Sequence, residues 1–175
     1  EKLSKETGIP AIVSMVANSG DEMKAYIDFF VSVTDMPFAI DMLMLKPRLE
    51  ATLYVAELGL MDRLLYNNIT PWSTDLKSEV LELKELGVKH VVIVVFDQED
   101  QIPTGRIKSL KSLLECIEGA GIENILVDTS VINLPATAMC LQANYMVKEQ
   151  FGLPAGCASA NGTYMWNENK AMRGK

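Results

Sequence analysis

The chain has 175 residues, of which 49% are hydrophobic and 22% are charged, and its formal net charge is −7. This length and composition predict one globular domain with a sizeable core and exclude a disordered segment. Lys and Arg are scattered along an acidic chain, which argues against binding to nucleic acid or to an anionic membrane surface. The longest apolar run, residues 91–96, is far too short for a membrane helix, so we expect no transmembrane segment.

The number and spacing of the cysteines indicate whether the protein's compartment is reducing or oxidising. Cys116, Cys140 and Cys157 are an odd number, lie far apart and form no C-x-x-C pair. This pattern argues for a reducing compartment and against a disulfide framework or a zinc site. The chain begins with Glu1 and has a charged N-terminus without an apolar signal segment. We therefore expect a cytoplasmic protein whose observed first residue is not the start of its gene.

Six short apolar runs recur along the chain, about 30 residues apart, which is the length of a strand with its crossover helix and loops. A short helix over residues 2–7 comes first. The predicted strands are residues 11–16, 38–40, 64–66, 91–96, 124–127 and 154–158. Amphipathic helices are predicted between them, and strands that alternate with helices predict a parallel sheet.

The intervening helices carry start and stop signals. Ser19 and Glu22 predict a capping box before a helix over residues 23–33. Pro47 suits the first turn of the next helix, and Gly59 ends it. The stripes predicted to cover the sheet include Leu49, Leu53, Val55 and Leu58 in that helix, and Ile107, Leu110, Leu114 and Ile117 in a later one.

Two architectures fit this alternation, an open doubly wound sheet and a (β/α)8 TIM barrel. No G-x-G-x-x-G follows the first strand, and the near-constant repeat favours the barrel. Six strands do not close an eight-stranded barrel. We therefore expect residues 1–175 to form a single barrel domain that supplies about six βα units and lacks the first and the last.

Polar residues stand where the predicted strands end, which is where such a barrel places its chemistry. They are Asp41, Asn67, Asn68, Asp97, Asp128 and Asn161. None is Lys, Arg or His, which argues against Schiff-base chemistry, a phosphate ligand or a metal site. His90, the only histidine, precedes a strand at the opposite end.

Carboxylates and carboxamides in this arrangement suit a neutral heterocycle with several N–H donors, such as a 2-amino-4-oxo pterin ring. Each residue also has a simpler interpretation. Asp41 and Asp128 are common in turns, and the two asparagines at 67–68 resemble a turn as well. Asp97 begins an acidic loop, and Asn161 precedes a glycine. Met42, next to Asp41, could line the pocket.

Several motifs together resemble a known family. They are Thr34-Asp35-Met36-Pro37-Phe38, Gly59-Leu60-Met61-Asp62-Arg63, Val127-Asp128-Thr129 and Phe151-Gly152-Leu153-Pro154-Ala155-Gly156-Cys157. In this order and spacing the chain resembles the family of the H subunit of tetrahydromethanopterin S-methyltransferase, and relatives that move methyl groups between tetrahydrofolate and corrinoid proteins. The likeness covers nearly the whole chain.

The resemblance implies a pterin-binding barrel in which Asp41, Asn67 and Asp128 hold the ring. Asn161 would lie near N5, which carries the methyl group, and would be the catalytic residue. The methyl group would move between a methylated tetrahydropterin substrate and the cobalt of a corrinoid. This chain has no D-x-H-x-x-G motif, so the corrinoid (cobalamin) would be carried by a partner protein. The family implies paired copies of the chain, in the cytoplasm or at the edge of a membrane methyltransferase complex.

Two departures from the family pattern leave alternatives open. Met42 replaces a small polar residue, and Ala160 replaces a histidine that often precedes the asparagine. The chain could therefore be a non-catalytic pterin-binding or scaffold subunit of a corrinoid methyltransferase complex. An enzyme of the dihydropteroate synthase kind would need a phosphate-binding Lys or Arg at the strand ends, and the sequence places none there.

Overall fold

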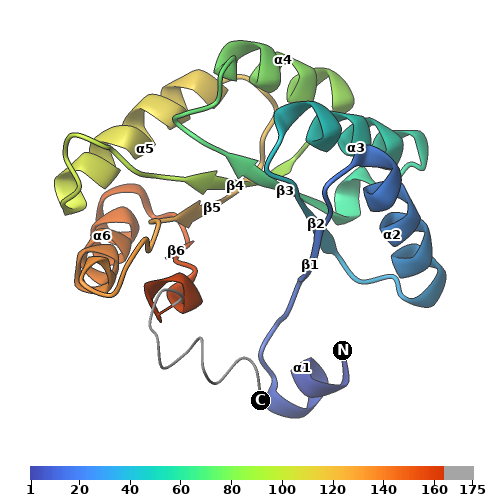
Figure 1. The fold of residues 1–175 in the computed structure, drawn as a ribbon, viewed down its shortest axis with the longest axis horizontal. Helices are drawn as coiled ribbons and strands as arrows, with labels where there is room; N and C mark the ends of the chain where they lie inside the picture. Colours follow the sequence, from blue (N-terminus) through green and yellow to red (C-terminus); the bar gives the residue numbers. More distant parts are fainter. Residues whose placement is uncertain (164–175) are drawn as a thin grey trace. The chain divides into compact units, whose positions relative to one another are not determined.

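The computed structural model describes residues 1–163 of the chain, and within them strands and helices alternate (Figure 1). The strands are Val13–Val16 (β1), Phe38–Asp41 (β2), Leu64–Ile69 (β3), His90–Val94 (β4), Asn124–Asp128 (β5) and Ala155–Gly156 (β6). The helices are Lys2–Thr7 (α1), Gly20–Val33 (α2), Leu45–Glu57 (α3), Leu76–Leu86 (α4), Pro103–Ile117 (α5) and Ala136–Phe151 (α6), with short 3-10 helices at Met61–Arg63 (η1) and Ser159–Thr163 (η2). The sheet order is β1-β2-β3-β4-β5-β6, and β1 with β2, β2 with β3 and β5 with β6 pair in parallel. The chain is therefore an α/β protein with a parallel six-stranded sheet.

The start of α2 shows how local sequence sets a helix boundary. The Ser19 hydroxyl accepts a hydrogen bond from the Glu22 backbone N–H at 3.2 Å. The Glu22 carboxylate accepts the Asn18 backbone N–H at 2.9 Å, so the returning bond goes one residue further back than in a standard capping box. The predicted capping box is confirmed in this shifted form.

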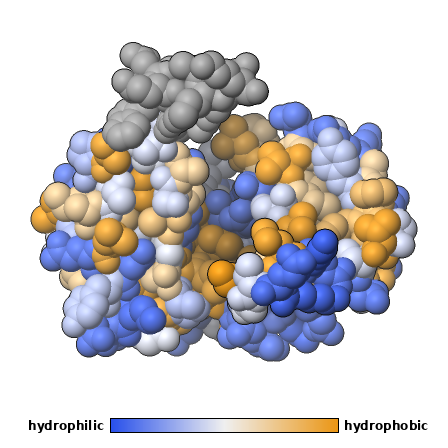
Figure 2. Space-filling view, turned by 90° about the horizontal axis from the view of Figure 1, so that it is seen from below, coloured by the Kyte–Doolittle hydropathy of each residue, from blue (hydrophilic) through white to orange (hydrophobic). Residues whose placement is uncertain are grey.

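The chain divides into two compact units. Unit 1 comprises Glu1–Asn67, Ser78–Val91 and Ala120–Glu123. In it α2 packs against α3, and these helices contact β1 and β2 (Figure 1). Phe38 and Ile40 are fully buried, whereas Val16 on the edge strand β1 is 67% exposed. Figure 2 shows hydrophobic residues interspersed with hydrophilic ones on the face seen from below.

Among the described residues, unit 2 comprises Asn68–Lys77, Val92–Gly119 and Asn124–Thr163. Here α5 packs against α6, and α6 also contacts β6 (Figure 1). Its core includes Ile93, Leu110, Val127 and Val147, all nearly or fully buried. A glycine in the left-handed region, Gly152 with φ 66°, ends α6.

The predicted strands and their parallel arrangement are confirmed, with boundaries that shift by a few residues. Two helix faces were predicted in part. In α3 Val55 is buried as predicted, whereas Leu53 is 47% exposed and Leu58, which follows the helix, is 41% exposed. In α5 Ile107, Leu110 and Ile117 are buried as predicted, and Leu113 is buried in place of Leu114. The buried face of α3 is Arg48, Ala51, Thr52 and Val55. Arg48 occupies this buried face because its side-chain partners, Tyr66 and Glu79, lie on other elements. The spacing of leucines within α3 does not reveal these partners.

Closure into a (β/α)8 barrel and a single-domain organisation stay predictions. Among residues 1–163 no helix combines the length and the apolar character that crossing a membrane requires.

Candidate functional site

In unit 1, β2 and β3 place two of the predicted residues side by side, although β3 continues two residues past Asn67 and not, as predicted, only to Tyr66. Asp41 is the last residue of β2, and Asn67 is its register partner on β3. Both side chains are half-buried. Neighbouring parallel strands carry in-register side chains to the same face, so a carboxylate and a carboxamide lie next to each other.

The Asp41 carboxyl is poorly solvated. Burial raises its pKa above the ordinary value, and the positive charge of Arg48 opposes that rise. Among residues 1–163 no hydrogen bond or ion pair is made by the Asp41 carboxyl oxygens. A carboxylate in this state retains acceptor capacity for N–H groups that a ligand brings.

A buried cluster formed by Arg48, Tyr66 and Glu79 adjoins these residues along the chain, because Tyr66 directly precedes Asn67 in β3. The Arg48 guanidinium donates to the Tyr66 hydroxyl at 2.8 Å and to the Glu79 carboxylate at 3.1 Å. Tyr66 in turn donates to Glu79 at 2.7 Å. Arg48 also lies over the Tyr66 ring, 5.1 Å from its centroid. Desolvation of the Tyr66 phenolate raises the pKa of Tyr66, so the hydroxyl keeps its proton and acts as the donor to Glu79.

This cluster fixes the loop that follows Asp41. Arg48 donates to the Met42 carbonyl oxygen at 2.7 Å. The Met42 side chain is only 2% exposed. Because Met42 follows Asp41 directly, the guanidinium restrains the backbone at the end of β2.

In unit 2 the end of β5 has its own aspartate. Asp128 is the last residue of β5 and pairs in register with Gly156 of β6. One carboxyl oxygen accepts the Ser130 backbone N–H at 2.8 Å. Burial raises the pKa of Asp128, and the hydrogen bond from Ser130 opposes the rise. Ser130 itself has φ 56°, a conformation that non-glycine residues seldom adopt and that is common at functional sites.

A second buried arginine fixes the loop after Asp128. Arg106, which is 1% exposed, donates to the carbonyl oxygens of Thr129 at 2.7 Å and Ser130 at 3.4 Å. It also donates to the Gln101 carbonyl oxygen just before α5 and lies over the Phe96 ring at 5.4 Å. The start of α5 and the turn after β5 are thereby joined through one side chain.

The loop between β4 and α5 passes close to the first turn of that helix. A Cβ on Gly105 would overlap the carbonyl oxygen of Asp100, so this backbone approach requires glycine. Asp97 begins the loop, and one of its carboxyl oxygens accepts the backbone N–H groups of Glu99 at 2.9 Å and Asp100 at 3.2 Å. These bonds lower the pKa of Asp97.

Asp97 thus acts as a cap of its own acidic loop and forms an ion pair with Lys108 at 3.7 Å. Asn68 is half-buried within β3 and belongs to unit 2. Asn161 lies exposed in η2, and its backbone N–H donates to the Ala158 carbonyl oxygen at 2.9 Å. Of the predicted strand-end residues, the structure places Asp41 beside Asn67. The ligand roles of all the predicted site residues, Met42 included, stay predictions.

Arg48, Glu79 and Arg106 were not among the residues predicted from the sequence. A signal for the arginines was present. Arg48 shares a helix face with Ala51, Thr52 and Val55, and Arg106 with Leu110, Leu113 and Ile117. An arginine at the first position of an apolar stripe, in the helix that follows a strand, indicates a buried guanidinium that binds loop carbonyls. Among residues 1–163 no three His, Cys, Asp or Glu side chains gather as metal ligands.

This parallel α/β chain has half-buried acids and amides at the strand ends, which is where proteins of this architecture place their ligand sites. The whole chain, residues 1–175, matches the family described as the tetrahydromethanopterin S-methyltransferase MtrH subunit. The chain belongs to this family.

Curated relatives agree with this assignment. The chain is 29% identical over 177 residues to the H subunit of tetrahydromethanopterin S-methyltransferase from Methanopyrus kandleri, a match over 95% of this chain and 54% of the relative. It is 31% identical over 176 residues to the H subunit of the putative methyltransferase mtx from Methanosarcina mazei, a match over 95% of this chain and 56% of the relative. The chain therefore spans about half the length of the curated relatives it matches.

Proposed function

We propose that this chain is the pterin-binding part of a methyltransferase that moves a methyl group between N5 of a reduced pterin and the cobalt of a corrinoid protein. The names of its relatives supply tetrahydromethanopterin as the first candidate pterin. Tetrahydrofolate is the second, since the resemblance includes tetrahydrofolate enzymes.

The observation that carries the proposal is the pair of half-buried aspartates at strand ends. Asp41 and Asp128 are desolvated enough to raise their pKa values, yet neither has a Lys or Arg ion pair within the described part of the chain. A pterin presents adjacent N–H groups along its amidine-like edge. Such donors would satisfy a carboxylate of this kind and favour its ionised form.

In this proposal Asp41, Asn67 and Asp128 bind and orient the ring, so that the methyl group faces the incoming nucleophile. A tertiary amine is a poor leaving group. The electron pair of the N5–methyl bond would stay on N5 and take a proton from solvent. The Asn161 carboxamide would donate a hydrogen bond to N5 as the negative charge develops, and would stabilise the transition state more than the ground state. An exposed side chain in a short 3-10 helix has the rotational freedom that this role requires.

The partners follow from this chemistry. Reduced cobalt would supply the nucleophile, and a separate corrinoid protein would bring it to the strand ends. The names of the relatives describe subunits, and this supports a multi-protein methyltransferase. In this proposal the chain works in the cytoplasm, as a pair of copies. The six βα units of the chain would be part of a closed (β/α)8 barrel.

The first test is methyl transfer to cob(I)alamin by the intact protein, followed by cobalt absorbance, with methyltetrahydromethanopterin and methyltetrahydrofolate in parallel. We expect transfer from one of them and a drop of about 100-fold or more in kcat for Asn161→Ala, the scale for losing a positioned donor. Transfer unaffected by Asn161→Ala would remove the proposed role of that residue.

Pterin binding is tested separately by calorimetric titration of the same protein. Asp128→Ala should weaken binding by about 1.5–3 kcal/mol, the scale for a hydrogen bond to a charged group. Glu123→Ala is the matched control, because Glu123 is an exposed carboxylate immediately before β5, at the opposite end of the same strand. Equal affinities for Asp128→Ala and the parent would contradict the pterin site.

The alternative of a scaffold that binds without catalysis rests on Met42 and Ala160, which depart from the family pattern beside two site residues. It predicts pterin binding in the titration together with no transfer from either pterin. The two measurements therefore separate an enzyme from a binding protein.

A further inference from the structure

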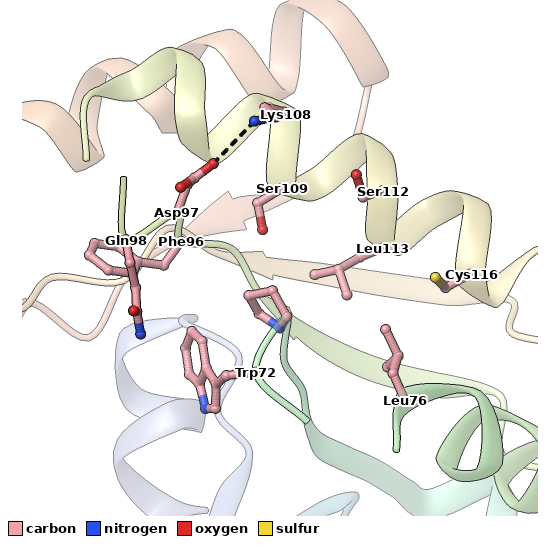
Figure 3. Close-up of a pocket in the computed structure, with 11 residues that line it drawn as sticks. Trp72, Leu76, Phe96, Asp97, Gln98, Lys108, Ser109, Ser112, Leu113 and Cys116 are labelled. Carbon is pink, nitrogen blue, oxygen red and sulfur yellow. Dashed lines mark ion pairs between the residues drawn. The ribbon is translucent and has the colours of Figure 1, made fainter. Parts of the chain in front are cut away.

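Unit 2 contains a pocket of about 330 Å³ formed by three segments (Figure 3). Pro71 and Trp72 come from the stretch between β3 and α4, and Leu76 is the first residue of α4. Phe96 comes from the loop after β4. The third wall is one face of α5, including Ser109 and Leu113. This volume lies at the lower end of the range for small-molecule sites and holds one or two fused rings.

A polar group without a partner faces into this pocket. Ser109 is 8% exposed, and its hydroxyl oxygen is the one buried side-chain oxygen or nitrogen within residues 1–163 that has no hydrogen-bond partner. Figure 3 shows Ser109 and Leu113 pointing from α5 toward the side of Trp72 and Leu76. A buried hydroxyl without a partner is costly, so a ligand that completes its hydrogen bond gains affinity.

The charges around the pocket cancel. Asp97 and Lys108 form an ion pair at 3.7 Å, and Asp97 is also held by two backbone N–H groups of its own loop. The residues that line the pocket therefore present no net charge to a ligand. Trp72, which is 53% exposed, provides a flat indole surface, and Leu76 and Leu113 provide aliphatic contacts. These features select a neutral ligand that is flat and largely apolar.

We infer that this pocket binds a small neutral aromatic molecule that carries one hydroxyl or amine group. The ring lies between Trp72 and Leu113, and its polar group forms a hydrogen bond with the Ser109 hydroxyl. No residue of the pocket other than Asp97 was predicted to take part in pterin binding, and Asp97 is bound to its own loop. The site is thus a second ligand site, independent of the methyl-transfer proposal.

Fluorine NMR of the intact protein tests this inference with 4-fluorophenol and 4-fluorotoluene, which differ in one hydroxyl group. We expect line broadening of 4-fluorophenol to show about fivefold tighter binding than that of 4-fluorotoluene. Ser109→Ala should remove this preference and leave 4-fluorotoluene binding unchanged. Ser112→Ala, an exposed serine three residues along the same pocket-lining helix, should change neither.

Trp72→Ala tests whether the ligand ring packs on the Trp72 indole, and it should weaken the binding of both probes severalfold. Ser109→Ala removes a buried hydroxyl that has no protein partner, so the variant should unfold at the parent's temperature or above it, which confirms an intact fold. Equal affinity of the parent for both probes, an unchanged preference in Ser109→Ala, or no broadening of either probe would each overturn the inference.

Discussion

Two buried arginines restrain strand-end loops in the two units by different means. Arg48 in unit 1 restrains the Met42 carbonyl next to Asp41, and its charge is balanced by the buried Glu79 carboxylate. Arg106 in unit 2 restrains the carbonyls that follow Asp128, and its described hydrogen bonds all go to backbone carbonyl oxygens. The first arrangement depends on a side-chain partner and the second on backbone dipoles. The difference predicts that a second substitution can restore stability when the Arg48–Glu79 pair is broken, but not when Arg106 is replaced.

The largest effect is expected at the ion pair of unit 1. Glu79→Met would leave the Arg48 guanidinium buried without its counter-charge, and we expect the free energy of unfolding to fall by about 3–5 kcal/mol. The double variant Arg48→Met with Glu79→Met removes both charges and should recover more than half of that loss. Chemical denaturation measures both values, with Lys46→Met on the exposed surface of α3 as the control. A double variant as unstable as Glu79→Met alone would mean that charge balance is not what the pair provides.

Arg106→Met should have the next largest effect, a loss of about 2–3 kcal/mol, because the Thr129 and Ser130 carbonyl oxygens lose a charged donor and keep the weak thiol donor of Cys140. No second side-chain change can remove a backbone carbonyl, so this loss should have no compensating partner. Lys108→Met, an exposed cation two residues along α5, is expected to change stability by less than about 0.5 kcal/mol. If denaturation shows Arg106→Met and Lys108→Met to be equally stable, Arg106 does not stabilise its unit as Arg48 does.

The smallest effect is a pH dependence that distinguishes the aspartates. Burial raises the pKa of Asp128, so the folded state holds the proton more tightly than the unfolded state, and ionisation removes stability as pH rises through the raised pKa. Asp128→Asn keeps the acceptor for Ser130 and should be more stable than the parent at neutral pH, with the advantage disappearing toward the ordinary aspartate pKa. Asp97 has a lowered pKa, so Asp97→Asn should show the opposite sign, a loss of stability at neutral pH that disappears as pH falls.

Denaturation series from acid to neutral pH measure both differences. Parallel curves for Asp128→Asn and the parent would contradict the raised pKa.

Much of the fold was predictable because its signals are local. Apolar runs, capping residues and glycines gave the six strands and the intervening helices to within a few residues, since each is determined by its near neighbours. Placing Asp41 next to Asn67 needed one further rule, that adjacent parallel strands end at the same edge. That rule holds whatever the packing of the helices.

The supporting arginines were not predictable in the same way. Arg48 is buried because Glu79, 31 residues away in sequence, reaches it from α4, and Arg106 because the turn after β5 directs carbonyl oxygens at it. Leucine spacing in α3 therefore missed Arg48 and included Leu53, which lies on the surface, although Val55 of the same stripe is buried. Interactions between distant elements decide such positions. The pattern within one helix marks an arginine on the buried face, but it does not identify the residues that bind it.

The close approach at Gly105 has a consequence for how relatives of this chain are compared. Because a side chain there would overlap the Asp100 carbonyl oxygen, the path of the loop over residues 97–102 and the glycine depend on each other. A related sequence with any other residue at this position must carry a loop of different length or course. A glycine at this position of a related sequence therefore indicates a β4–α5 connection shaped like this one. It also indicates the pocket that borders this connection.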